Sequence, residues 1–534
     1  MDHPTPNSYL PEPVIQSILK LLPPKDAIRA SLTSKLWRSA WITSPVFEFE
    51  EKSLPFKQSD FYDYAERCLA IWSDHCDDRV NMEKLSVYSD VGADGIFFPR
   101  FVELVSIAKN RNVKIIELHN CSEDYHSHRI LSTDSLWSLI SACKSLDVLS
   151  MKSFQLSLAI TLPVFSSVKK LVLSVIGIDN SSLRYLISCL PLLEELVFGF
   201  CFVFTELHVS SPKLKSMEVS LCANIAQNVF IDCVNLQSFT YTRAFNAHGL
   251  LKFTNCNMLK TLLIDRTEIN TANALDEYLP QIPFLENLRL INCHLNEGVE
   301  SVQISHSNLK SLVVTGCYRM RKVEFNTPNL RYFKYSGGIF TISKFRYCSG
   351  LLNVKLELYT GSLDGTEWFW FVRLRNFLEI FSDCGALNLS FHLEGFPEEL
   401  RHYDMLPDPF YQLTHLKITN RMFPISQQAN FLNAFVELFP HVETFSLKAI
   451  DCELTIKFDE DGGFNLSWIP FIRASTTDEY DKNFQEMKDC IETIVNLLSW
   501  TEENYSEEEN CADEHSEMDV SRNVVKRFES ALWT

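Results

Sequence analysis

The chain has 534 residues, of which 46% are hydrophobic and 22% charged, and its net charge is −19. This composition is typical of a soluble globular protein, and the longest apolar run, at 196–204, is far shorter than the roughly 20 residues of a membrane helix. Its start has neither a basic region nor an apolar run, so no secretory signal is expected. Residues 1–50 hold five acidic and five basic residues, which does not predict nucleic-acid binding. We expect a protein of the cytoplasm or nucleus that does not bind a membrane.

Three short helices are predicted near the N-terminus. Pro13 can begin the first, because a first turn does not need the missing N–H, and a double proline at 23–24 ends it. A second is expected from about 25 to 33, and a third carries Trp37 and Trp41 on one face. The first helix has an apolar face made of Val14, Ile15, Ile18, Leu19 and Leu22. Helices this short cannot bury all their apolar side chains, so a partner or neighbouring domain is expected.

A repeat occupies most of the chain that follows. From residue 168 a six-residue pattern recurs in which the first, fourth and sixth residues are apolar, as in LENLRL at 285–290. Eight steps cover the 183 residues from 168 to 351, a mean period of about 23, and weaker copies lie at 82–151 and 384–447. This period falls within the range of leucine-rich repeats.

The repeat pattern predicts the fold class. Alternate apolar residues such as Leu288 and Leu290 point from one face of a short strand into the core. The stretches between strands carry helix signals, as at 179–193 and 270–285. One repeat cannot bury its own apolar face, so neighbours must stack. We therefore expect an α/β leucine-rich-repeat solenoid, curved, with a parallel sheet on the concave side and a small all-α unit at its N-terminus.

Cysteine spacing also follows the repeat. Eleven of the 16 cysteines lie at or near the turns beside the predicted strands, where a small buried thiol fits, which favours structural thiols and a reducing compartment. There is no CxxC pair, and the histidines of HSH at 126–128 have no third ligand near them in sequence. No metal site or cofactor is predicted.

The C-terminal part carries different signals. The aromatic stretch at 367–381 is interpreted as a helix on the convex side rather than a ligand pocket. Further on, an amphipathic helix is predicted from Phe484, Met487, Ile491, Ile494 and Leu498. We interpret it as a cap on the last repeat, with a partner-binding helix as the alternative. The stretch 501–519 has nine acidic residues and no Lys or Arg, which predicts disorder.

The N-terminal residues resemble the F-box motif. Its usual elements correspond here to Leu10-Pro11, Ile18-Leu19, Leu22-Pro23-Pro24-Lys25-Asp26, Ser34-Lys35-Leu36-Trp37-Arg38 and Trp41. With the repeats, the chain resembles the plant F-box/leucine-rich-repeat group over roughly 10–50 and 79–450. Thr33 departs mildly from the motif, and a CLLSSLK-like stretch of many relatives is not found, so that module's role is not carried over. The expected domains are an F-box at 8–50, a helical linker at 51–78, a solenoid at 79–450, a cap at 451–500 and an acidic tail at 501–534.

The resemblance implies a non-catalytic adaptor of an SCF-type E3 ubiquitin ligase. It would dock a Skp-family protein, and through it a cullin and a RING subunit, while the repeats hold an unknown protein substrate. The implied Skp-binding residues are Leu10, Pro11, Ile18, Leu19, Leu22, Pro23 and Trp37. No GxxxxGK[ST], GxGxxG, HExxH or GxSxG motif occurs, so no catalytic residue is predicted. The alternatives are an interaction scaffold with a vestigial F-box and a small-molecule receptor of the hormone type.

A substrate surface is predicted on the strands. Side chains between the apolar positions project from the concave sheet, and the repeats at 193–335 are the most uniform. The predicted substrate-binding residues are Glu218, Asn287, Arg289, Ser311, Tyr332 and Lys334. The alternative is that these are ordinary solvated strand residues, with binding on the loops around 361–410 or the C-terminal segment. The residues predicted at concave positions carry charges of both signs, which does not favour an anionic cofactor. They include Glu218, Thr240, Asp265, Arg289, Lys334 and Lys417.

Overall fold

The protein divides into two compact units, Met1–Leu262 (unit 1) and Leu263–Thr534 (unit 2), which are described separately. The computed structural model describes residues 10–53, 58–77, 79–91, 96–121, 134–156, 164–202, 204–221, 228–243, 250–269, 275, 278–295, 302–317, 322–339, 341–346, 350–360, 367–382, 384–393, 410, 413–419, 438–439, 442–450, 452–458 and 464–470. The predicted helix around 484–498, the acidic tail and the HSH stretch lie outside these residues.

Unit 1 begins with the three predicted helices. They are α1 (Glu12–Leu21), α2 (Pro24–Ser31) and α3 (Lys35–Ile42). Prolines begin the first two, because Pro11 and Pro23 hold extended backbone at the N-cap and the next turn follows directly. Ser34 caps the third, its Oγ accepting a hydrogen bond from the Trp37 amide at 3.2 Å.

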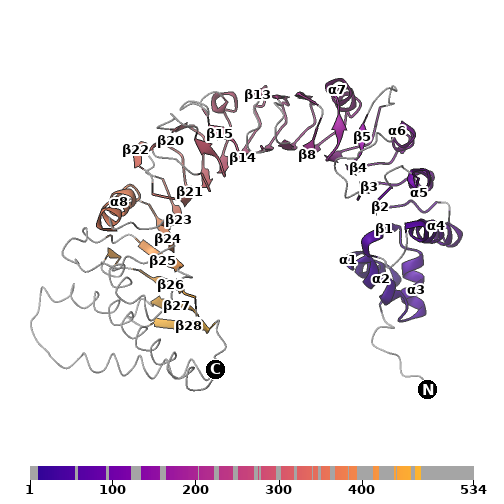
Figure 1. Ribbon diagram of the computed structural model, residues 1–534, viewed down its shortest axis with the longest axis horizontal. Helices are drawn as coiled ribbons and strands as arrows, with labels where there is room; N and C mark the ends of the chain where they lie inside the picture. Colours follow the sequence, from indigo (N-terminus) through magenta and orange to yellow (C-terminus); the bar gives the residue numbers. More distant parts are fainter. Residues whose placement is uncertain are drawn as a thin grey trace, which may run out of the picture. The chain divides into compact units, whose positions relative to one another are not determined.

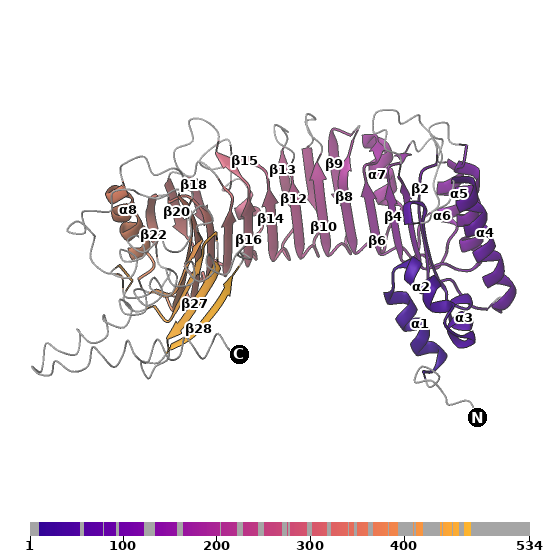
Figure 2. The ribbon, with the colours of Figure 1, turned by 60° about the horizontal axis from the view of Figure 1, so that its bottom comes forward.

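A parallel sheet forms the body of unit 1, as the repeat predicts. Successive strands pair with one another in chain order and lie side by side (Figure 2). On β2, β3 and β4, Leu85, Ile116 and Leu149 lie in register and are at most 1% exposed, so one side of each strand is core. The strands are β1 (Val46–Glu50), β2 (Lys84–Ser89), β3 (Ile115–Asn120), β4 (Val148–Lys152), β6 (Lys170–Ser174), β8 (Glu195–Cys201), β10 (Ser216–Leu221) and β12 (Ser238–Thr242).

Helices cover the core side of the first strands in unit 1. Figure 1 shows α5, α6 and α7 on the same side of this sheet, with α4 next to α5. These helices are α4 (Gln58–His75), α5 (Phe98–Asn110), α6 (Asp134–Ser141) and α7 (Asn180–Ser188). The helix predicted at 179–193 is therefore confirmed as α7. The other side of the sheet, which carries the polar strand residues, is called the open face below.

After α7 the stretches between the main strands form strands instead of helices. A second parallel sheet consists of the strands β9 (Glu206–Ser210), β11 (Asn228–Asp232) and β13 (Leu251–Thr254). ELHVS on β9 alternates polar and apolar residues, and on both β9 and β11 every second residue is buried, namely Leu207, Val209, Val229 and Ile231. A period of two favours a strand over a helix, which explains why the expected helices do not form here. A short pair, β5 (Gln155–Leu156) and β7 (Gly177–Ile178), completes unit 1.

Unit 2 repeats this design and ends differently. Its main strands run parallel from β16 to β26, and β27 and β28 then pair antiparallel. They are β16 (Asn287–Ile291), β19 (Ser311–Thr315), β21 (Tyr332–Gly337), β23 (Asn353–Thr360), β24 (Ala386–Leu393), β25 (Leu413–Thr419), β26 (Thr444–Lys448), β27 (Cys452–Phe458) and β28 (Phe464–Pro470); β14 (Thr261–Asp265) lies at the division between the units.

Short strands and one helix lie between the main strands of unit 2. A second sheet contains β18 (Val302–Ser305), β20 (Lys322–Asn326) and β22 (Thr341–Arg346), and β15 (Glu268–Ile269) pairs with β17 (His294–Leu295). The aromatic stretch forms the predicted helix, α8 (Glu367–Glu379), and Phe377 packs against Tyr335. The helix expected at 270–285 is, where described, only the single 3-10 turn Leu279–Gln281.

The cysteines of the repeat turns are free thiols, most of them buried in the described chain. Five thiols donate hydrogen bonds to a carbonyl of the preceding repeat, between 3.3 and 3.6 Å; the pairs are Cys201–Leu173, Cys233–Val209, Cys256–Ile231, Cys293–Ile264 and Cys317–Leu290. Burial raises the pKa of the Cys143 and Cys233 thiols to about 11. The five thiols that bond to the preceding repeat are therefore packing groups that connect one repeat to the next.

Two further features are absent from the part of the chain that the structure describes. None of its helices combines the length and the apolar character needed to cross a membrane. The same residues contain no group of three or more His, Cys, Asp or Glu side chains placed to hold a metal ion.

One prediction concerns the cap of α7. Asp179 accepts hydrogen bonds at 2.9 Å from the amides of Ser181 and Ser182, and bonds from the Ser181 and Ser182 hydroxyls help lower its pKa to about 2. The Asp179→Ala variant should lower the free energy of unfolding at pH 7 by about 1 kcal/mol. Because the folded pKa lies below the ordinary 3.8, this difference should shrink as the pH falls from about 4 toward 2.

Denaturant unfolding at a series of pH values checks this, with Asp179→Asn as the matched control. Asn caps a helix about as well as Asp but does not titrate, so it should remain near wild type at neutral pH. A pH-independent difference between wild type and the Ala variant would contradict a role for the carboxylate.

Candidate functional site

The N-terminal bundle has a very small core. Its buried side chains are Ile15, Leu19, Ala27 and Ala40. Around them pack partly buried apolar residues, namely Leu10, Leu22, Ala30, Leu36, Trp37 and Trp41. Four buried residues offer little apolar area to stabilise three helices, so the bundle depends on what it packs against.

The seven predicted Skp-binding residues fall into three classes. Leu19 belongs to the core and can only support a surface. Pro11 and Pro23 are exposed at the N-caps of α1 and α2. The other four are half-buried, and three of them pack against the core; they are Leu10, Ile18, Leu22 and Trp37. Their contact with a partner stays a prediction.

The structure adds apolar side chains that the sequence analysis did not select. Leu21 is 85% exposed at the end of α1, and Leu32 is 77% exposed at the C-cap of α2. Val14, predicted on the apolar face of α1, is 42% exposed. Leu21 is out of phase with the apolar face Ile15–Leu19 of its helix, which is the signal that could have identified it. Three large apolar side chains are thus exposed on a unit whose core contains only four buried apolar residues.

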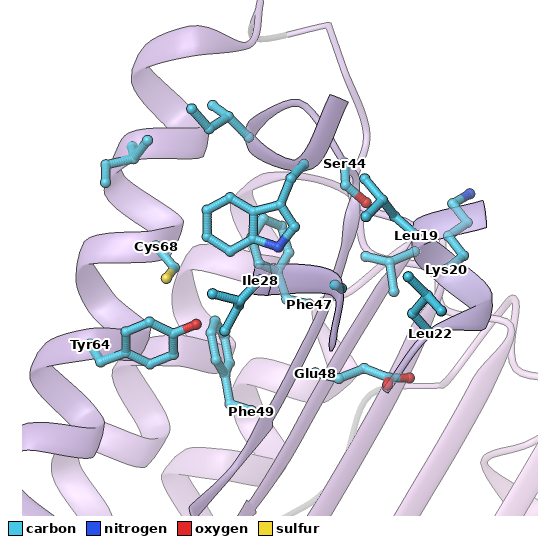
Figure 3. Close-up of a pocket in the computed structure, with 15 residues that line it drawn as sticks. Leu19, Lys20, Leu22, Ile28, Ser44, Phe47, Glu48, Phe49, Tyr64 and Cys68 are labelled. Atoms are coloured by element: carbon cyan, nitrogen blue, oxygen red, sulfur yellow. The ribbon is translucent and has the colours of Figure 1, made fainter. Parts of the chain in front are cut away.

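A pocket marks the junction between the bundle and the repeats. Figure 3 shows Ile28, Phe47 and Phe49 between Tyr64 and Cys68 of α4 on one side and the α1 end on the other. Aromatic contacts hold β1 to α4, since Phe47 meets Trp72 edge-on at 5.4 Å and Phe49 meets Tyr64 at 6.1 Å.

Polar contacts join the same parts. Lys20 of α1 forms an ion pair with Glu83, the residue before β2. Within the bundle, the Thr43 hydroxyl donates to Glu12 at 2.9 Å and accepts from Gln16 at 3.0 Å, which ties α1 to the end of α3. The bundle is therefore fixed to the first repeats through both apolar and charged contacts.

Charges on the open face of the first repeats are paired with one another. Lys84 lies 2.7 Å from a Glu48 oxygen and 3.1 Å from a Glu117 oxygen, and Ser86 and Tyr88 donate to Glu117 at 2.8 Å. Burial alone would lower the pKa of Lys84, but the bonds to the two glutamates outweigh it and raise the pKa. Burial would raise the pKa of Glu117, and the Ser86, Tyr88 and Lys84 contacts outweigh it and lower the pKa. All three charged groups of this cluster are therefore paired, and one ammonium group between two carboxylates leaves it with a net negative charge.

Five of the six predicted substrate-binding residues come together in unit 2. Asn287 and Arg289 lie on β16, and Ser311, Tyr332 and Lys334 follow on the neighbouring strands β19 and β21. They lie on the side of the unit 2 strands opposite the buried residues, which is called the open face of unit 2, and there Arg289 is exposed and the others are half-buried. The sixth, Glu218, is exposed on β10 in unit 1. Whether they bind a substrate stays a prediction.

Sequence families match three parts of the chain. The F-box domain matches residues 8–49. The family described as FBD-associated F-box protein At5g56370, LRR repeats, matches residues 103–261, and the one described as At1g61320/AtMIF1, LRR domain, matches residues 245–458.

Curated relatives come from Arabidopsis thaliana. The putative F-box protein At1g49610 is 29% identical over 213 residues, covering 40% of this chain and 49% of the relative. The putative F-box/FBD/LRR-repeat protein At4g00315 is 31% identical over 196 residues, covering 36% and 42%. The chain thus spans about half the length of the relatives it matches. The three-helix bundle is therefore an F-box domain, the stacked strands are leucine-rich repeats, and the chain is a homologue of the Arabidopsis F-box/FBD/LRR-repeat proteins.

Proposed function

We propose that this chain is the substrate-recognition adaptor of an SCF-type E3 ubiquitin ligase in the cytoplasm or nucleus. F-box domains generally bind Skp-family proteins, and this chain has one at residues 8–49. In the proposal the Skp-family protein connects it to a cullin and a RING subunit, and the repeats hold a target protein. Isopeptide bond formation then belongs to other subunits, and this chain raises the effective concentration of target lysines near the conjugating enzyme.

The observation that carries the proposal is the exposure of Leu21 and Leu32 on the bundle. Burying a leucine side chain contributes about 1.5–3 kcal/mol, so a partner that covers both would gain substantial affinity. Pro11 and Pro23 are also exposed, whereas Leu10, Ile18, Leu22 and Trp37 offer only part of their surface. We assign Leu19 a supporting role beneath this surface, because it lies in the core.

The junction with the repeats supports an adaptor role as well. A ligase adaptor must hold its target at a usable distance from the rest of the complex. The ion pair between Lys20 and Glu83 and the aromatic contacts of Phe47 and Phe49 restrict movement between the F-box and the first repeats. The target would then lie on the open face of the repeats, including the strands that carry Arg289 and Tyr332.

The first test replaces the exposed leucines. Leu21→Glu combined with Leu32→Glu should weaken co-purification with a Skp-family protein at least about a hundredfold, because roughly 3 kcal/mol of apolar burial is lost. Both side chains point into water, so the melting temperature should barely change. The matched control is Val234→Glu with Met258→Glu, two apolar residues that are each 45% exposed outside the F-box, and it should bind normally. Full binding by the leucine variant would show that Leu21 and Leu32 do not form the contact, whereas a wild-type chain that fails to co-purify would favour the scaffold with a vestigial F-box.

A second test addresses the start of α1. Leu10→Ala with Pro11→Ala should also abolish co-purification, because it removes an apolar contact and the proline that begins the helix. Circular dichroism and the melting curve of the repeats should stay close to wild type, since these residues lie outside the repeat core. Retained Skp binding in this variant would show that the F-box surface lies elsewhere on the bundle.

A further inference from the structure

Three basic side chains lie in one row across the open face of unit 2. The strand pairings place Arg289 opposite Val313, Val313 opposite Lys334, and Lys334 opposite Lys355. Neighbouring strands are about 4.8 Å apart, so the row extends roughly 14 Å from β16 to β23. Residues separated by 66 positions in the sequence are thus side by side on one face.

Most of this positive charge is not neutralised within the described part of unit 2. Arg289 and Lys355 are exposed, and neither forms an ion pair with another described residue. Lys334, between them, lies 2.7 Å from a Glu357 oxygen. The neighbouring acids are engaged elsewhere. Glu286, directly before β16, lies 3.1 Å from Lys310, and Asp265 on β14 accepts a hydrogen bond from Asn292 at 3.2 Å and lies 3.7 Å from Arg266.

The acidic and basic residues that the sequence placed on one concave surface therefore lie in different parts of the structure. Glu218 and Thr240 belong to unit 1, and Asp265 is partly buried with its own partners. What remains on β16 to β23 is a net cationic row. Such a row attracts anionic groups, and its attraction weakens as salt is added.

A row of neutral hydrogen-bonding side chains runs beside the cations. Asn287, Ser311, Tyr332 and Asn353 are in register, two residues earlier on the same four strands. Along a strand two residues span about 6.7 Å. The face thus presents amide and hydroxyl groups next to guanidinium and ammonium groups, which suits a peptide with both backbone amides and carboxylates.

We propose that the open face of β16 to β23 binds an extended acidic segment of the target protein. This proposal rests on the proposed adaptor function and names the class of its target. In an extended peptide, residues i, i+2 and i+4 lie on one side and span about 13–14 Å, close to the length of the cationic row. Carboxylates at these positions would meet Arg289, Lys334 and Lys355, with Arg289 able to bind one of them through two parallel hydrogen bonds.

The test uses a fluorescent nine-residue peptide that has Glu at alternate positions. Its binding to the full chain is measured by fluorescence anisotropy at low and at physiological salt. The same peptide with Gln in place of Glu is the reference. The Glu peptide should bind at least tenfold more tightly than the Gln peptide, and the preference should fall as salt rises. Equal binding of the two peptides, or no binding of either, would overturn the proposal.

Variants locate the site. Arg289→Glu with Lys355→Glu should weaken binding of the Glu peptide at least tenfold, because both exposed charges are reversed. The matched control is Lys152→Glu, an exposed lysine on the open face of unit 1, which should stay within about twofold of wild type. An equal loss in the control would overturn the assignment to this face. So would a single-stranded oligonucleotide that binds the same residues more tightly than the peptide.

Two further measurements separate competing explanations. The acidic stretch at 501–519 could itself occupy the row, so a variant with its Glu and Asp replaced by Gln and Asn is tested in parallel. Peptide binding that appears only in this variant would identify the chain's own tail as the occupant and overturn the proposal. Skp co-purification is recorded for every variant, so a failure of the adaptor function is distinguished from a failure of peptide binding.

Discussion

Every repeat of this chain depends on its neighbours to bury the apolar side of its strand. In unit 1 one row runs through Leu85, Ile116, Leu149, Leu171, Leu196, Met217 and Phe239, all in register and at most 1% exposed. A shift by one residue would turn a whole strand's apolar set outward. The same register aligns the polar side chains on the other face, so the core determines which charges become neighbours.

The turns show how tightly this register is held. The chain leaves several strands through a residue with positive φ, as at Asn255, Arg266, Asn292 and Gly316. At Gly316 a Cβ atom would come within 2.3 Å of the Asn292 Oδ1 atom of the preceding repeat, so only glycine fits. The cysteine thiols that follow these turns then bond to the repeat before, as Cys293 and Cys317 do. The sharp turn and the small thiol together hold the end of one strand in register with the end of the strand before it.

Sequence periodicity predicted the strands well, because the apolar positions are local and recur about every 23 residues. It did not predict that β9 and β11 replace helices, because the helix signals at 179–193 and 270–285 favoured helices between the strands. The proposed binding surfaces were harder to predict, because they depend on three-dimensional arrangement. Leu21 could have been identified from its phase on α1, whereas Leu32 at the C-cap of α2 carries no such signal until its exposure is known. The cationic row required both the strand register and the knowledge that Asp265 is already engaged, and neither is local in sequence.

The contact between β1 and the bundle has a consequence for how the protein is built. A stack of repeats has an open first strand whose backbone and apolar side would meet water. Here Val46–Glu50 supplies that first strand directly after α3, and the bundle residues Leu19, Ile28 and Trp41 close over it. The domain that is proposed to bind the Skp-family protein therefore also caps the first strand of the repeats. Removing the first 50 residues would take away β1 together with the helices and leave β2 as the open edge of the sheet.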